Sequence, residues 1–148
     1  MLGADNQQER REKITLKIYN LLIFMVKVVI YEDSEDDLIQ RYGSLVRDHE
    51  VHVRIKKPTS IFPVDRAKII KAGFVESRII EDWFTPIQGD VYFLDGLNGD
   101  CLPILERLPR GNSFLNTGTV YLEEEARKRG HVILETTPQE AIRSLNIK

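Results

Sequence analysis

The feature that most constrains the fold is a short apolar run, Val-Tyr-Phe-Leu at residues 91–94, enclosed by turn-forming residues. Gly89 and Asp90 precede the run, and Asp-Gly-Leu-Asn-Gly follows it at residues 95–99. Four consecutive apolar residues between turn signals are typical of a strand that is buried on both faces, as in the middle of a parallel sheet. Such a strand needs helices on both sides, so we expect an α/β fold.

The rest of the chain alternates strand-like and helix-like patterns around this run. Further strands are expected at residues 26–31, 51–55, 113–115 and 131–134, with amphipathic helices after each of them. This order predicts five strand–helix units in a doubly wound parallel sheet of the flavodoxin-like type, with strand order 2-1-3-4-5. It also places an extension before the first strand and an expanded section before the third.

The expanded section, residues 57–88, has the least regular pattern. Asp65 is placed to cap a short helix that runs to Ala72 and stops at Gly73. A second helical face is expected from the spacing of Ile79, Ile80, Trp83 and Phe84. In the strand at 51–55, apolar and polar residues alternate, which predicts a half-exposed or edge strand.

The domain boundary is expected near Met25, which directly precedes the first strand pattern. Residues 1–24 are interpreted as an N-terminal extension, compatible with translation from an upstream start codon, and residues 25–148 as the folded domain. The apolar stretch at 18–31 is interrupted by Asn20 and Lys27. A bilayer span needs about 20 apolar residues, so we expect no membrane insertion and no secretory signal.

Composition excludes several classes of function. The formal net charge is −2, so bulk charge predicts neither nucleic acid nor an anionic membrane as a partner. The single cysteine, Cys101, excludes an intramolecular disulfide and a cysteine-based zinc cluster, and it fits the reducing cytoplasm. His49, His52 and His131 do not have the spacing of metal ligands.

Acidic residues follow two of the expected central strands. Glu32 and Asp33 follow the first strand, and Asp95 follows the third. In the 2-1-3-4-5 order these two strands are neighbours, and ligands bind at the carboxyl ends of strands at that point. Several carboxylates in one small site repel one another, which a hard cation such as Mg²⁺ relieves. Thr117, after the fourth strand, is expected to point its hydroxyl at the same place.

These residues resemble those of response-regulator receiver domains. The segment 28–34, Val-Val-Ile-Tyr-Glu-Asp-Ser, is similar to the first strand and acidic pair of that family, and 90–95 is similar to its third strand with the phospho-accepting aspartate. The resemblance implies that Glu32, Asp33, Asp95 and the Leu97 carbonyl hold Mg²⁺. It also implies that Asp95 accepts the phosphoryl group and that Thr117 binds it. A histidine kinase or another signalling protein is the implied partner.

The chain departs from the family pattern at three places. Thr137 replaces the phosphate-binding lysine, Leu134 lies where the family usually has an aromatic switch residue, and the turn after Asp95 is short and has no proline. Without the lysine, a fixed positive charge is missing. Phosphorylation is then weak, or another cation substitutes, or the chain is a pseudo-receiver that binds partners without being phosphorylated.

The same residues also fit purely structural roles. Glu32 and Asp33 can cap the first helix, Asp95 can be a turn residue, and Thr117 can be a turn or cap residue. Three hypotheses therefore remain at this point. The first is a single-domain receiver-like signalling protein, with no enzymatic activity beyond the phosphorylation and dephosphorylation of Asp95. The alternative is a non-phosphorylated interaction module. The third is a phosphotransferase or phosphatase with Asp95 as nucleophile, which the absence of a second acid at Leu97 argues against.

Overall fold

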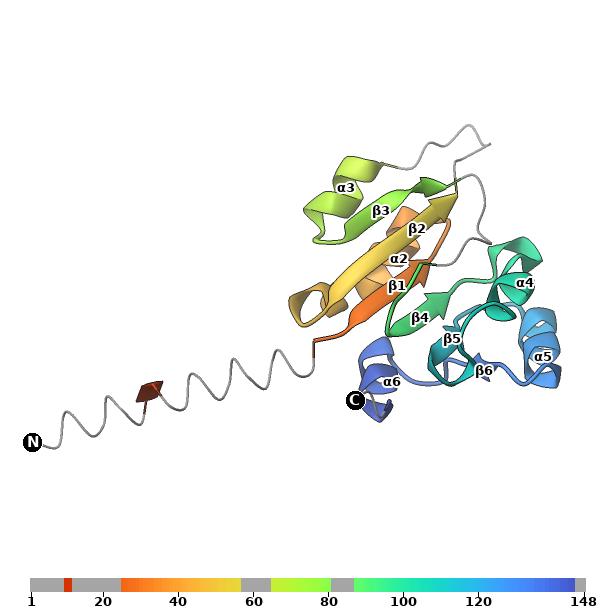
Figure 1. Ribbon diagram of the computed structural model, residues 1–148. Helices are drawn as coiled ribbons and strands as arrows, with labels where there is room; N and C mark the ends of the chain where they lie inside the picture. Colours follow the sequence, from red (N-terminus) through yellow and green to blue (C-terminus); the bar gives the residue numbers. More distant parts are fainter. Residues whose placement is uncertain (1–9, 12–24, 57–64, 81–86, 146–148) are drawn as a thin grey trace, which may run out of the picture.

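Six strands lie side by side in the order β3-β2-β1-β4-β5-β6, and all neighbouring pairs are parallel (Figure 1). The computed structural model describes residues 10–11, 25–56, 65–80 and 87–145. The strands within these ranges are β1 (Lys27–Tyr31), β2 (Glu50–Lys56), β3 (Val75–Ile80), β4 (Val91–Leu94), β5 (Ser113–Leu115) and β6 (Val132–Ile133). The chain runs outward from β1 to β3 and then returns to β4, so the direction of winding reverses between β1 and β4.

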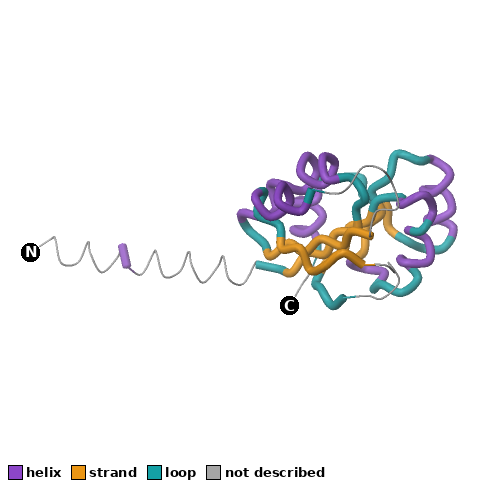
Figure 2. Tube along the Cα trace, turned by 90° about the horizontal axis from the view of Figure 1, so that it is seen from above, coloured by secondary structure: helices purple, strands orange, loops and turns teal. Residues whose placement is uncertain are grey.

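Helices cover both faces of the sheet (Figure 2). Residues of α2 (Glu35–Tyr42), α3 (Arg66–Lys71) and α6 (Pro138–Ser144) belong to one buried apolar cluster, and residues of α4 (Cys101–Leu105) and α5 (Val120–Lys128) belong to another. Three single 3₁₀ turns, η1 (Gly43–Arg47), η2 (Leu97–Gly99) and η3 (Arg110–Asn112), complete the described elements.

Strand β1 shows why this layered arrangement forms. Its side chains point alternately to the two faces, so Val28 and Ile30 join one apolar cluster while Val29 and Tyr31 join the other. All four are fully buried. Burial of each such apolar side chain contributes about 1.5–3 kcal/mol to folding. The central strands therefore fix the sheet between two helical layers.

The expected α/β class, the parallel sheet and the relative order of five strands are confirmed, but a sixth strand was missed. Ile79 and Ile80 lie in β3, beside β2, and not on a helix. A short apolar run fits a buried strand and a helix face equally well, and here pairing with β2 decides. Trp83 and Phe84, expected on the same helix face, lie outside the described residues.

Of the two alternatives predicted for 51–55, a half-exposed strand or an edge strand, the edge strand is wrong. β3 pairs with β2 on the side away from β1, so β2 has neighbours on both sides. Arg54 is only 2% exposed, and the Cζ atom of its guanidinium lies 5.7 Å from the centre of the Tyr31 ring. The alternating pattern therefore reflects a charged side chain buried against an aromatic ring, not a solvent-exposed edge.

Three helices begin at side-chain caps. Ser34 accepts a hydrogen bond from the Asp37 N–H at α2, Asp65 from the Lys68 N–H at α3, and Thr137 from the Glu140 N–H at α6. These caps satisfy donors that the first turn leaves unpaired. Asp100, which directly precedes α4, makes no such side-chain hydrogen bond.

Most of the predicted N-terminal extension, residues 1–24, lies outside the described residues. Among the helices of the described ranges, none combines the length and apolar character needed to cross a bilayer.

Thr137→Ala is expected to lower the free energy of unfolding by about 1 kcal/mol, because the first turn of α6 loses its cap. Thr136→Ala is the matched control. The Thr136 hydroxyl is exposed and donates only to the Thr137 carbonyl, so a change within about 0.5 kcal/mol is expected. Urea denaturation followed by circular dichroism measures both. Equal losses in the two variants would contradict the capping role of Thr137.

Candidate functional site

Backbone hydrogen bonds that continue past the strands align the carboxyl ends of β1, β4 and β5. The Asp95 N–H donates to the Tyr31 carbonyl at 2.9 Å, and the Asn116 N–H donates to the Leu94 carbonyl at 2.8 Å. The residues that follow these strands are therefore brought to one edge of the sheet. Because β1 and β4 flank the reversal of winding, this edge is where an open α/β sheet binds its ligands.

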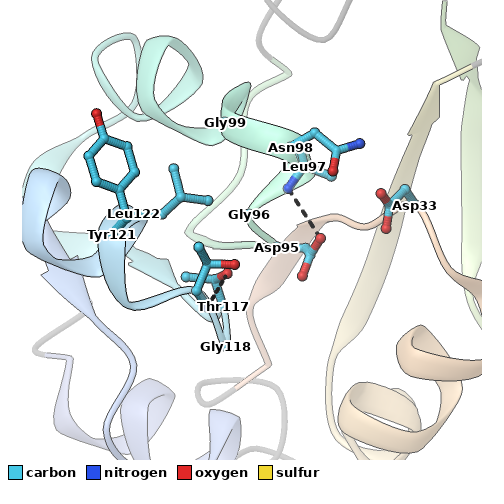
Figure 3. A pocket seen from close by; sticks show the side chains of 11 residues that line it. Asp33, Asp95, Gly96, Leu97, Asn98, Gly99, Thr117, Gly118, Tyr121 and Leu122 are labelled. Atoms are coloured by element: carbon cyan, nitrogen blue, oxygen red, sulfur yellow. Dashed lines mark hydrogen bonds between the residues drawn. The ribbon is translucent and has the colours of Figure 1, made fainter.

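Glu32, Asp33 and Asp95 converge at this edge, as predicted. One carboxylate oxygen from each lies within 4.8 Å of the other two. Glu32 is buried, Asp95 is half-buried and Asp33 is exposed, so the cluster opens to solvent on one side. Figure 3 shows Asp33 and Asp95 facing each other across this opening. Oxygen ligands at this spacing suit a hard divalent cation.

Glu32 presents one oxygen to the backbone and the other to the cluster. Its Oε1 accepts hydrogen bonds from the Asp33 N–H at 3.0 Å and the Ser34 N–H at 3.2 Å. Its Oε2 is buried and receives no hydrogen bond from the described residues. A buried carboxylate oxygen without a donor is costly, and a bound cation would satisfy it. Ser34, and not Glu32, is the N-cap residue of α2.

Burial and like charge both raise carboxyl pKa values in this cluster. Burial, followed by the negative charge of Asp95, raises the pKa of Glu32 to about 8. Burial is also the main reason why the pKa of Asp95 is raised, and the nearby Asp33 adds to it. Without a cation, the ionised form of the cluster is therefore disfavoured.

Arg41, in the last turn of α2, supplies a positive charge to the site. Its Nη1 lies 3.7 Å from Asp95 Oδ1 and 4.0 Å from Glu32 Oε2. This role was not predicted from the sequence. The Arg41 side chain is 36% exposed, and no periodicity within its own segment indicates a contact with the residue that follows β4.

The turn after Asp95 has an unusual backbone. Leu97 and Asn98 have φ values of 51° and 55°, in the left-handed region. For leucine this conformation costs about 1–2 kcal/mol. The Leu97 N–H donates to Asp95 Oδ2 at 3.2 Å, so the turn fixes the carboxylate that it follows (Figure 3). Nothing in the residue type of Leu97 predicts this geometry.

Gly96 allows the turn to pass close to the end of β5. A Cβ atom on Gly96 would lie 2.7 Å from Thr117 Oγ1 and 2.9 Å from Leu122 Cδ1, too close for either. The structure therefore shows a close approach in which a side chain at residue 96 would force Thr117 and Leu122 to shift.

Thr117 lies beside Asp95 and lines the same pocket, which has a volume of about 480 Å³. Its Oγ1 accepts a hydrogen bond from the Thr119 N–H at 3.2 Å. Thr117 therefore has the expected role in a turn and also lines the pocket. The rest of the lining comes from Asp33, Gly96, Leu97, Asn98, Gly99, Gly118, Thr119, Tyr121 and Leu122.

Other residues implied by the resemblance lie differently. The Leu97 carbonyl accepts the Asp100 N–H at 3.1 Å within η2, while Leu97 itself lines the pocket. Thr137 uses its hydroxyl to cap α6 and is not among the pocket residues. Leu134 packs against the apolar cluster that contains α2 and α6.

One further contact links this edge of the sheet to α2. The Asn116 side-chain amide donates to the Tyr42 hydroxyl oxygen at 3.1 Å. Tyr42 directly follows Arg41, so the last turn of α2 contacts both the acidic cluster and the end of β5. No sequence pattern indicates this pair, because its members lie 74 residues apart.

The chain was compared with protein-family models, with curated proteins and with solved structures, and none of the three comparisons gave a match.

Glu32→Gln is expected to change how stability depends on pH. A glutamate with a pKa of 4.5 when unfolded and about 8 when folded holds its proton more tightly in the folded state, so stability falls as pH rises between these values. Glutamine does not ionise. In the presence of EDTA, the free energy of unfolding of the variant, relative to that of the native chain, should therefore rise by on the order of 1 kcal/mol or more between pH 5 and pH 9.

Urea denaturation at several pH values measures this difference. Glu135→Gln is the matched control, because the Glu135 side chain is exposed and contacts only Arg127. A difference between Glu32→Gln and the native chain that stays constant with pH would contradict the raised pKa of Glu32.

Proposed function

We propose that this chain is a single-domain, receiver-like signalling protein in which Asp95 accepts a phosphoryl group in the presence of Mg²⁺. The observation that carries the proposal is the convergence of Glu32, Asp33 and Asp95 at the reversal point of the sheet, with Glu32 Oε2 buried and without a hydrogen bond. The pocket beside Asp95, which Thr117 also lines, supports it further.

Glu32, Asp33 and Asp95 would hold the metal ion. The Leu97 carbonyl, which accepts the Asp100 N–H, would add its second lone pair. The oxygen donors match the preference of Mg²⁺. When bound, the ion offsets the negative charge of the carboxylates and of the incoming phosphoryl oxygens. The ionised form of Glu32 is then favoured, so metal binding releases its proton.

In the proposed step, an Asp95 carboxylate oxygen forms a bond to the phosphorus of the donor. The bond from phosphorus to the donor breaks, and its electron pair stays with the donor, a phosphohistidine of a partner kinase or a small acyl phosphate. The Leu97 N–H, already bonded to Asp95 Oδ2, holds the carboxylate in place. The Thr117 hydroxyl, on the same pocket, is available to donate to a phosphoryl oxygen.

The alternative is a pseudo-receiver that binds a protein partner without phosphorylation. Two observations favour it. Thr137, in place of the usual lysine, is committed to capping α6. Val120 and Tyr121, at the start of α5, are 65% and 68% exposed, and Tyr121 borders the pocket. Apolar side chains exposed in this way favour contact with a protein.

Dinucleotide binding is a further function to consider, because the order β3-β2-β1-β4-β5-β6 also occurs in dinucleotide-binding domains. Their first strand–helix turn is rich in glycine, and the helix N-terminus binds pyrophosphate. Here the turn is Glu32-Asp33-Ser34, and Glu35, Asp36 and Asp37 form the first turn of α2. These negative charges would repel pyrophosphate, so we do not propose this function.

The proposal is tested by two-dimensional amide NMR, with Mg²⁺ and then beryllofluoride added to the native chain and to Asp95→Asn. In the native chain, beryllofluoride should shift the amides near Glu32, Asp95 and Thr117. In Asp95→Asn this response should be lost, because the variant has no carboxylate to coordinate the beryllium. Asp100→Asn, which changes a carboxylate outside the pocket, should respond like the native chain.

A native chain that responds to Mg²⁺ but not to beryllofluoride would contradict phospho-acceptance and favour the pseudo-receiver. Shifts that persist unchanged in Asp95→Asn would show that the phosphate mimic binds elsewhere.

A further inference from the structure

Arg41 contacts the two carboxylates that the proposed metal ion needs most. Its Nη1 is 3.7 Å from Asp95 Oδ1, the oxygen that the Leu97 N–H leaves free, and 4.0 Å from the buried Glu32 Oε2. Asp33, the exposed member of the cluster, forms no ion pair with Arg41. The guanidinium therefore lies beside the buried and half-buried members of the acidic cluster.

The two contacts depend on charge and not on hydrogen bonding. Both distances exceed 3.5 Å, too long for a hydrogen bond, and Glu32 Oε2 has none from the described residues. The Arg41 side chain is 36% exposed, so its head group can move into solvent without breaking a buried hydrogen bond. An ion that binds the same oxygens more closely can replace it.

Arg41 and a divalent cation cannot both remain close to these oxygens. They carry charge of the same sign, and within about 5 Å in a partly buried site such charges repel strongly. A monovalent ion brings no more charge than the guanidinium that it displaces. A divalent ion brings one charge more, so the exchange favours divalent ions.

We infer that Arg41 is a tethered counter-ion of the acidic cluster which a divalent cation must displace, so that Arg41 sets the metal concentration at which the site fills. The inference rests on the metal site of the proposed function and adds a determinant of its affinity and selectivity. It does not depend on phosphorylation of Asp95.

The test measures the Mg²⁺ dissociation constant of the full chain by amide NMR titration at constant ionic strength. Arg41→Gln should bind Mg²⁺ about tenfold more tightly than the native chain, because the competing charge is gone. Arg41→Lys keeps the charge and should stay within about threefold of the native value. Arg47→Gln is the matched control, since Arg47 is exposed on η1 and loses the same charge away from the cluster; it should bind within about twofold of the native chain.

A second readout on the native chain covers the case in which Arg41→Gln is too unstable to measure. The Arg41 side-chain Nε–Hε resonance should shift with added Mg²⁺ and saturate together with the Asp95 amide. An Arg41→Gln variant that binds Mg²⁺ no more tightly than the native chain would overturn the inference, as would an Arg41 resonance that ignores Mg²⁺.

The failure of this inference differs from the failure of the proposed function. A native chain that binds Mg²⁺ but not beryllofluoride loses phospho-acceptance, while tighter Mg²⁺ binding by Arg41→Gln still supports the role of Arg41. If neither the native chain nor Arg41→Gln binds Mg²⁺ at tens of millimolar, both the metal site and the counter-ion role are wrong.

Discussion

The pairing of β1 with β4 is the interaction on which the rest of the structure depends. The register joins Val28 to Val91 and Tyr31 to Leu94, and the Asp95 N–H extends it by one more bond to the Tyr31 carbonyl. This register places Asp95 next to Glu32 in space although 63 positions separate them in sequence. A slip of one residue would turn every side chain of β4 to the opposite face. Burial of both faces therefore fixes the register, and the register fixes the site.

The site that results stores unfavourable electrostatic energy. A buried glutamate, a half-buried aspartate and a second aspartate share a small volume. Burial, and then the negative charge of Asp95, raises the pKa of Glu32 to about 8. A fold that served stability alone would not retain such a cluster, because apolar residues of similar volume would be more favourable. An unfavourable free energy that is confined to one place in a fold is characteristic of functional sites. The left-handed backbone conformation of Leu97 adds to this energy.

The sequence was sufficient to predict the central strands and the convergence of the carboxylates, because the first follow from apolar runs and the second follows from the parallel order of the strands. Val91–Leu94 is buried as its apolar run indicates, and Glu32, Asp33 and Asp95 converge because the ends of parallel neighbours share an edge. The strand at Val75–Ile80 was not predictable with the same rules, since its length and composition fit a helix face as well.

Details that depend on contacts between distant residues were also beyond the sequence. Arg41 reaches Asp95 from another element, and the Gly96 turn approaches Thr117 so closely that a Cβ at residue 96 would force Thr117 to shift. Both depend on how α2 and the end of β5 pack around the sheet. Periodicity within one segment contains no information on such packing.

The sixth strand has a consequence for how this domain can be altered. β3 joins the sheet through β2 alone, so two strands, β2 and β1, separate it from β4. Its outer edge has no strand partner among the described residues. Additions at that edge change the width of the sheet without changing the positions of the strands that hold the carboxylates. For protein engineering, the β3 edge of the sheet is therefore the better place to attach a reporter or a second domain. Changes to the pairing of β1 with β4 would disturb the strands that position the carboxylates.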